Sequence, residues 1–197
     1  INQETMLLLH QMLIGGINDA IAGRFRVKGE YVRVGAHIAP APERIDDLLH
    51  DTLTEYSSDL NSFLIDKVAK FHLSFEMIHP FIDGNGRMGR VLMNTQLLKL
   101  GFPVIIIRDK AKQEYYKAFD EFRLKKNTKA MEKAVTLALM ESLHKRITYL
   151  KGDTIVTLAD YTKKQGKSAV SLLNAARRQT IPAFREKGVW KIGENAV

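Results

Sequence analysis

The stretch "HPFIDGNGRMGR" (79–90) decides how the rest of the chain is interpreted. It separates two segments whose apolar residues recur at helical spacing. The residue before a proline disfavours the α region, so the first helix is expected to end near His79. Gly84 and Gly86 flank Asn85 just before the second helix resumes. The stretch therefore predicts a polar loop that ends at a helix N-terminus.

Such a loop is suited to binding an anion. Glycines allow positive φ and close backbone approach, so the N–H groups of Gly84, Asn85 and Gly86 can converge on one point, where the helix dipole adds positive potential. Arg87 and Arg90 are three residues apart, which places both on one side of the first turn. Their planar guanidinium groups fit phosphate oxygens. Two arginines beside such a nest indicate a polyphosphate.

Two further residues add chemistry to this anion site. Asp83 precedes the nest and can bind a Mg²⁺ that bridges phosphates, while His79 can accept a proton near neutral pH. Together these residues suit transfer of a phosphoryl-type group to a hydroxyl. The alternative is a polar turn, because "DGNG" is common in turns and a single histidine is more often structural. The fixed spacing of the whole set favours the functional interpretation.

Composition and charge bound the class of protein. The chain has 197 residues, no cysteine and no apolar run near the ~20 residues of a membrane span. It therefore has no disulfide or thiolate metal site, and we expect a cytoplasmic protein without membrane contact. It begins at Ile1, so we expect a fragment of a longer protein. Residues 151–197 hold nine Lys/Arg and four Asp/Glu, against 21 and 18 in residues 1–150, which predicts a separate basic module.

The remaining pattern predicts a mainly α fold. A β-hairpin is expected within residues 24–39 and a short buried connector at 103–107. Residues 151–153 are the expected linker, so the predicted domains are 1–150 and 153–197. The helices are expected at 4–22, 43–56, 64–78, 88–98, 109–125 and 129–150.

The C-terminal module reads as a winged helix. Thr157 and Ser168 are good N-caps for two short helices, and "TIPAF" (180–184) and "VWKIG" (189–193) read as strands around a basic turn. This part resembles winged helix modules of the excisionase or MerR type, which implies double-stranded DNA as a partner. Phosphate contacts would come from the end of the recognition helix and from the wing, at Arg177, Arg178, Arg185 and Lys187. The alternative is a solvated basic face or a module that recruits a protein target.

The motif at 79–90 resembles the Fic family signature, His-Pro-Phe-x-(Asp/Glu)-Gly-Asn-Gly-Arg-x-x-Arg, at every defined position. The segment "YVRVGAHIAPAPERIDDLL" (31–49) is similar to the family's flap and the helix after it, and the resemblance covers residues 4–150. It implies a mostly helical domain that transfers AMP from ATP to a Ser, Thr or Tyr hydroxyl of a target protein or of the enzyme itself.

The resemblance also implies a role for each matching residue. His79 would be the base, Phe81 an anchor in the core, and Asp83 the ligand of Mg²⁺ on the α- and β-phosphates. The anion hole would be Gly84, Asn85 and Gly86, and the β- and γ-phosphates would be held by Arg87 and Arg90. A flap at about 31–39 would cover the nucleotide and align the target by strand addition, chiefly through Val34, Gly35, Ala36 and His37. Tyr115 matches a tyrosine of the nucleotide pocket.

Regulation and rival functions stay open at this point. Many Fic proteins carry an inhibitory helix with Ser/Thr-x-x-x-Glu-Gly/Asn; the nearest match is Thr128 to Glu132, but Lys133 follows. A DNA-binding regulator with an inactive or self-regulatory Fic site is the main alternative, and a homodimer is one of the open oligomeric states. Glu76-x-x-His79 and Glu141-x-x-His144 match a di-iron pattern, although Pro80 should pull His79 out of the helix.

The other histidines are expected to be structural. His10 and His50 are predicted at the surface or at its boundary. His72 neighbours Phe71 on the helix that leads to the loop, which favours a partly buried, hydrogen-bonded role.

Overall fold

The computed structural model describes residues 1–108 and 112–196, without the side chains of residues 112–114. The contacts divide the chain into two units. The first comprises Ile1–Phe102 and the described residues from 107 to 134; the second comprises Pro103–Ile106 and the chain from Val135 onward. The division falls inside a helix, at 134–135. The predicted domain boundary at 151–153 stays a prediction.

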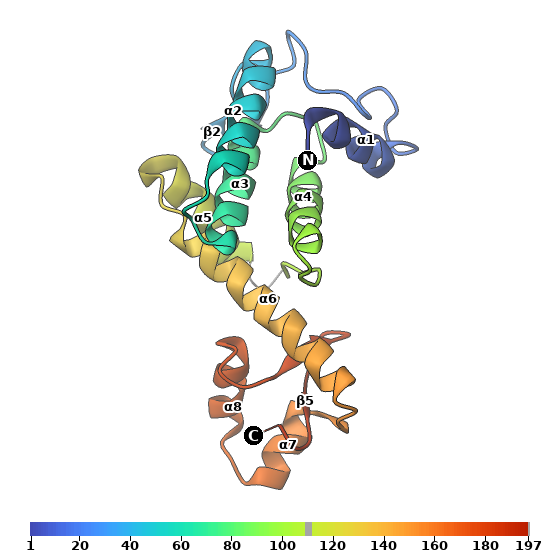
Figure 1. Cartoon of the computed structure of the whole chain (residues 1–197), viewed down its shortest axis with the longest axis vertical. Coiled ribbons are helices and arrows are strands. Elements are labelled where there is room, and N and C mark those ends of the chain that lie inside the picture. The colour runs from blue at the N-terminus through green and yellow to red at the C-terminus, as the bar shows by residue number, and fades with distance from the viewer. Residues whose placement is uncertain (109–111, 197) are drawn as a thin grey trace. The chain divides into compact units, whose positions relative to one another are not determined.

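The first unit is helical apart from one small hairpin (Figure 1). The predicted mainly α fold class is confirmed. Among the described residues, no helix combines the length and apolar character needed to cross a membrane. The elements of the first unit are α1 (Gln3–Ile14), β1 (Arg33–Val34), β2 (His37–Ile38), η1 (Pro42–Arg44), α2 (Ile45–Ser58), α3 (Leu64–Ile78), α4 (Asn85–Lys99), α5 (Lys112–Lys125) and the start of α6 (Lys129–Leu150).

Helix α3 is the centre of this unit and packs against α2, α4 and α5 (Figure 1). In the predicted apolar stripe, Val68, Phe71, Phe75 and Ile78 are at most 5% exposed, whereas Leu64 at the start of the helix is half-buried. Phe81, which follows the helix, joins the same core. Because the helix delivers the loop directly from the core, the polar loop starts from a fixed position.

Helix α1 is shorter than predicted, because it ends at Ile14 instead of continuing to residue 22. A Cβ added at Gly15 would lie 2.6 Å from the carbonyl oxygen of Gln11, and Gly16 has φ +78°. Two consecutive glycines therefore end the helix, and residues 15–23 form turns. The apolar periodicity beyond Ile14 misled the prediction.

Two other expectations also need correction. The hairpin is present but has only two residues per strand, with Arg33 paired to Ile38 and Val34 to His37. The connector at 103–107 is not uniformly buried: Ile105 is buried, whereas Val104 and Ile106 are 43% and 62% exposed. The prediction assumed that a continuous run of apolar residues is buried on every side.

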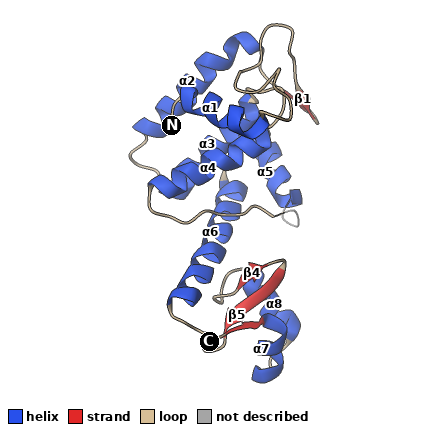
Figure 2. Cartoon of the chain, turned by 90° about the vertical axis from the view of Figure 1, so that its right-hand side faces the viewer, coloured by secondary structure: helices blue, strands red, loops and turns tan. Residues whose placement is uncertain are grey.

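The second unit combines the rest of α6 with two short helices and a three-stranded sheet of order β3-β5-β4 (Figure 2). Thr157 and Ser168 cap α7 and α8 as predicted. The strand expected at 180–184 is wrong except for Phe184, and a third strand, β3, was missed because three residues carry too little pattern. The elements are β3 (Ile155–Thr157), α7 (Leu158–Gln165), α8 (Ala169–Arg177), β4 (Phe184–Glu186) and β5 (Val189–Gly193).

Candidate active site

His79 ends α3 in a left-handed conformation, φ 50° and ψ 59°, where its N–H still bonds the carbonyl of Phe75 at 3.0 Å. This backbone region is uncommon for a residue other than glycine and is found where the surroundings hold it in place. The ring Nδ1 lies 3.3 Å from the carbonyl oxygen of Glu76. An N–H at Nδ1 that donates to this carbonyl leaves Nε2 with a free lone pair.

Electrostatics favour the same neutral form of His79. Burial lowers the pKa of its imidazole, and the positive charge of Arg26 and the nearby His37 lower it further. Below this pKa the ring would be protonated, so a lowered value keeps it neutral at pH 7. The structure thus presents a partly buried imidazole that can accept a proton.

Arg26 supports the start of the loop by hydrogen bonds to backbone carbonyls, and the sequence did not identify it. Its guanidinium donates to the carbonyls of His79 (2.8 Å), Glu30 (2.9 Å), Pro40 (3.0 Å) and Ile78 (3.3 Å). Its own N–H donates to Pro80 at 2.8 Å. The side chain is 3% exposed. A basic residue in a β-rich segment gave no signal of burial, because its partners are backbone carbonyls far along the chain.

Asn85 closes the other end of the loop. Its amide oxygen accepts from the Phe81 N–H at 2.9 Å, and its amide nitrogen donates to the Phe81 carbonyl at 2.8 Å. The side chain is 2% exposed. The side chain therefore fixes the loop's shape, and only the backbone of Asn85 is available to an anion.

His10 supports the loop from α1. Its ring stacks on Phe81 at 3.7 Å with an interplanar angle of 8°. Nδ1 accepts from the Gly23 N–H at 3.0 Å, so Nε2 carries the hydrogen and donates to the Asp83 carbonyl at 3.1 Å. The ring is fully buried. The expected surface position of His10 is wrong, because the bonded partners are distant in sequence, whereas His50 is exposed as predicted.

The N-terminus of α4 has no side-chain cap, so its first N–H groups can bind a ligand. Gly84 is the N-cap at φ 82°, and no side chain caps the helix. The first N–H groups of a helix have no partner within it, which leaves those of Asn85, Gly86 and Arg87 for an anion. A Cβ on Gly84 would lie 2.9 Å from Ile14 Cδ1, so both φ and packing against α1 require glycine.

Asp83 and Arg87 lie at the mouth of this turn. Asp83 Oδ1 accepts from the Gly84 N–H at 2.6 Å, and Oδ2 lies 3.1 Å from Arg87 Nη2. Their side chains are 64% and 39% exposed, so both are accessible to a ligand. Among the described residues, no three His, Asp or Glu side chains are grouped to hold a metal. A cation at Asp83 would need further oxygens from a ligand or water, which is the usual pattern for Mg²⁺ with phosphates.

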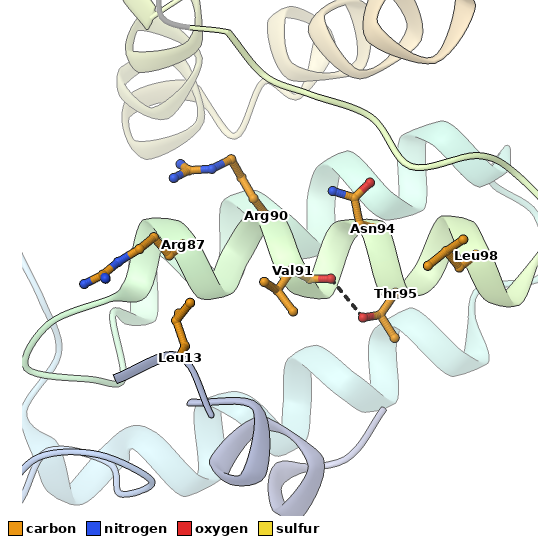
Figure 3. Close-up of a pocket in the computed structure, with 7 residues that line it drawn as sticks. All are labelled: Leu13, Arg87, Arg90, Val91, Asn94, Thr95 and Leu98. Carbon is orange, nitrogen blue, oxygen red and sulfur yellow. Dashed lines mark hydrogen bonds between the residues drawn. The ribbon is translucent and has the colours of Figure 1, made fainter. Parts of the chain in front are cut away.

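A pocket of about 420 Å³ runs beside the two arginines (Figure 3). Its volume is in the range of small-molecule sites, ~300–1,000 Å³. One face of α4 forms most of the wall, with Leu13 of α1 opposite. The α4 residues that line it are Arg87, Arg90, Val91, Asn94, Thr95 and Leu98.

Behind Arg90 lies a buried polar cluster. Tyr115 is 4% exposed, and its hydroxyl is bonded to a ring nitrogen of His72 and interacts with Arg90. His72 is 1% exposed, so its predicted structural role is confirmed with deeper burial than expected. Tyr115 thus contacts an arginine of the predicted site. Glu76, one turn after His72 on α3, completes the cluster.

The hairpin is attached to the end of α3. His37 Nε2 lies 2.8 Å from the carbonyl oxygen of Met77. Val34, Gly35 and Ala36 are exposed around the turn, where Gly35 has φ +59°. The hairpin therefore presents exposed backbone next to the helix that ends in His79.

The remaining sequence candidates lie apart from this loop. Arg177, Arg178 and Lys187 are exposed, but Arg185 is bonded to Glu141 at 2.8 Å and stacks 4.7 Å above the Trp190 ring. Glu132, the nearest match to an inhibitory glutamate, is bonded to Thr128 and Lys129.

The di-iron pattern finds no support in the described residues. His79 is outside helical geometry, and His144 Nδ1 is bonded to Gln179 at 2.8 Å. Glu141 is engaged with Arg185. Glu76 and Glu141 lie in different compact units.

Comparisons with known proteins agree with this site. The Fic/DOC family model matches residues 1–97. "Protein adenylyltransferase Fic" of Drosophila willistoni is 38% identical over 120 residues, 57% of this chain, and that of Drosophila virilis is 36% identical over 59% of it. The chain spans only about a quarter of the length of these relatives, 23% and 24%.

Solved structures show the same fold. Fic-1 from C. elegans aligns with a TM-score of 0.67 at 26% identity, over 77% of this chain and 44% of that one. A Fic family protein from Desulfovibrio desulfuricans aligns over 98% of this chain and 68% of that one, with a TM-score of 0.61 at 24% identity. The motif, the loop geometry and these matches identify residues 1–97 as a Fic/DOC family domain.

Proposed function

We propose that this chain is a protein adenylyltransferase that transfers AMP from ATP to a Ser, Thr or Tyr hydroxyl of a target protein. The observation that carries the proposal is a neutral, partly buried His79 beside an uncapped helix N-terminus with two arginines. The similarity to proteins named protein adenylyltransferase supports the same activity.

The loop's geometry supports a base-assisted displacement. The target hydroxyl oxygen attacks the α-phosphorus of ATP, and His79 Nε2 accepts the hydroxyl proton. The bond from the α-phosphorus to the oxygen that bridges to the β-phosphate breaks, and pyrophosphate leaves. The N–H groups at the start of α4, with Arg87 and Arg90, stabilise the charge that develops on the phosphates.

Asp83 is the residue that would hold Mg²⁺. Its carboxylate is exposed at the mouth of the turn, and phosphate oxygens and water would supply the other ligands. The ion would bridge and neutralise the phosphates. Binding would draw Asp83 Oδ2 away from Arg87, which frees that guanidinium for a phosphate.

The hairpin would hold the target. Val34 ends strand β1, Gly35 and Ala36 form the turn, and all three residues are exposed. An extended target segment can add to the edge of this hairpin by main-chain hydrogen bonds. His37 anchors the hairpin to α3. Tyr115 would orient Arg90 through its hydroxyl.

The lack of cysteines suits a reducing compartment, and we propose the cytoplasm.

For residues 153–197 we propose a winged helix that binds double-stranded DNA, as a second and separate function. The observation in its favour is that Arg177 and Arg178 are exposed at the end of α8, with Lys187 exposed in the β4–β5 turn. Arg185 would act indirectly, since it is engaged with Glu141. We expect binding to a duplex that weakens steeply with salt and is reduced by Arg177→Ala with Arg178→Ala. If the protein bound no duplex at any salt concentration, this role would be excluded.

Position-specific labels test the main proposal. ATP labelled at the α-phosphate should label the protein itself or proteins of a lysate, whereas ATP labelled at the γ-phosphate should not. Label from the γ-phosphate alone would indicate phosphoryl transfer instead, and label from neither would oppose an enzyme of either kind.

A further inference from the structure

Glu76 is a buried acid that the proposed reaction does not use. It lies on α3 three residues before His79 and is 9% exposed. Its Oε1 has no hydrogen-bond partner among the described residues, and its Oε2 lies 3.9 Å from His79 Nδ1. A buried carboxyl oxygen without a hydrogen-bond partner is costly, so its presence needs an explanation.

Helix α4 leaves space for this carboxyl group. A Cβ added at Gly89 would lie 2.6 Å from Glu76 Oε1 and 2.7 Å from His72 Cε1, so a side chain there would have to displace these groups. A Cβ added at Gly86 would lie 3.9 Å from the same oxygen and 3.6 Å from Arg90 Nη1. The carboxyl group of Glu76 and the guanidinium of Arg90 therefore both lie close to Gly86, in the first turn of α4.

Arg90 is the cation that faces Glu76. The other titratable groups around it are His72 on α3, His79 at its end and Tyr115 on α5. Burial lowers the pKa of His72 to about 4 and lowers that of His79, and it raises that of Tyr115, so all three are neutral near pH 7. Burial raises the pKa of Glu76 to about 7, although the charge of Arg90 opposes this.

We propose that Glu76 is a positioning residue that holds Arg90 as an internal counterion and competes for it with the polyphosphate of a bound nucleotide. This inference rests on the proposed function, because it assumes that Arg90 binds phosphates. An ionised Glu76 repels a polyphosphate bound at this turn, whereas a protonated Glu76 does not. Nucleotide binding should therefore favour the protonated acid and take up a proton from solution.

The pH dependence of nucleotide affinity tests this coupling. The ligand is a non-hydrolysable ATP analogue with Mg²⁺, and its Kd is measured from pH 7 to 9. As pH rises, Glu76 ionises, so the wild-type Kd should weaken by up to about tenfold per pH unit, the limit for one linked proton. Glu76→Gln should bind with a Kd that stays constant over this range. Glu55→Gln, which removes an exposed carboxylate on α2, should keep the wild-type slope.

A wild-type Kd that does not change with pH, or an equal slope in Glu76→Gln, would overturn the role of Glu76 while leaving nucleotide binding intact. Calorimetry on the wild type provides a second test that needs no variant. Binding at pH 8 in two buffers of different ionisation enthalpy should show net proton uptake, and zero uptake or release would also overturn the inference. No binding at any pH would instead contradict the proposed function.

Discussion

The Arg26 guanidinium donates to the carbonyl oxygen of His79 at 2.8 Å, from a position 53 residues earlier in the chain. The same group also bonds the carbonyls of Ile78, Glu30 and Pro40, so one buried cation joins the end of α3 to the segments before and after the hairpin. The left-handed backbone of His79 is thus held at both of its polar groups. Its carbonyl accepts from Arg26, and its N–H donates to the carbonyl of Phe75. This arrangement explains how a strained residue can keep one orientation at the proposed active site.

Arg26→Ala should lower the free energy of unfolding by about 3 kcal/mol, because several buried carbonyls lose a charged donor. Denaturant unfolding would measure this loss. Arg24→Ala is the matched control, since Arg24 forms a more exposed ion pair with Glu30, and it should cost clearly less. Equal losses in the two variants would contradict the role given to Arg26.

Asn85→Ala should cost about 2 kcal/mol of stability, because the Phe81 N–H and carbonyl both lose their partner in a buried place. The loop should also loosen, so affinity for nucleotide should fall. Thermal unfolding and nucleotide titration measure the two effects. Asn61→Ala, in an exposed loop, should leave both within error.

His10→Phe preserves the stack on Phe81 but removes the bonds to Gly23 and Asp83. We expect a loss of about 1–3 kcal/mol, since two backbone groups near the ring become unpaired. Chemical denaturation would show it, with His50→Phe at an exposed position as control. An unchanged stability would mean that stacking alone supports the loop.

Parts of this architecture were predictable because their signals are local. The stripe on α3 and the Pro80 that follows His79 predicted the end of that helix, and the glycines around Asn85 predicted the start of the next. The loop composition also predicted His79, Asp83, Arg87 and Arg90 as candidate site residues. These features depend on neighbours within a few residues, so one sequence contains the information.

The supporting residues were not predictable for the opposite reason. Arg26, His10 and Glu76 act through partners that tertiary packing brings together. A buried arginine, a buried histidine and an unpaired acid also contradict the general preference of these residues for the surface. The short strand β3 shows the same limit, because its three residues are held by packing in the sheet. The early end of α1 has a local cause, because Gly15 and Gly16 end the helix although the apolar periodicity continues.

The reaction should depend on the neutral form of His79. Because the pKa of its imidazole is lowered, the ring is the free base above that value and is protonated below it. The kcat/KM for the target should therefore be constant near pH 7 and fall on the acid side, with a midpoint below 6.5. Initial rates of AMP transfer from pH 5 to 7.5 measure this limb. A midpoint above 7 would contradict a lowered pKa.

The most direct test of the account compares wild type with His79→Ala at saturating ATP labelled at the α-phosphate. Loss of a general base removes about 10²–10⁴-fold of rate, whereas the phosphate contacts at Gly84–Arg87 and Arg90 remain. We predict that the variant binds nucleotide with a Kd within about twofold of wild type but transfers at least about a hundredfold less label. Equal labelling by the two proteins would contradict the assignment of His79 as the base that drives AMP transfer.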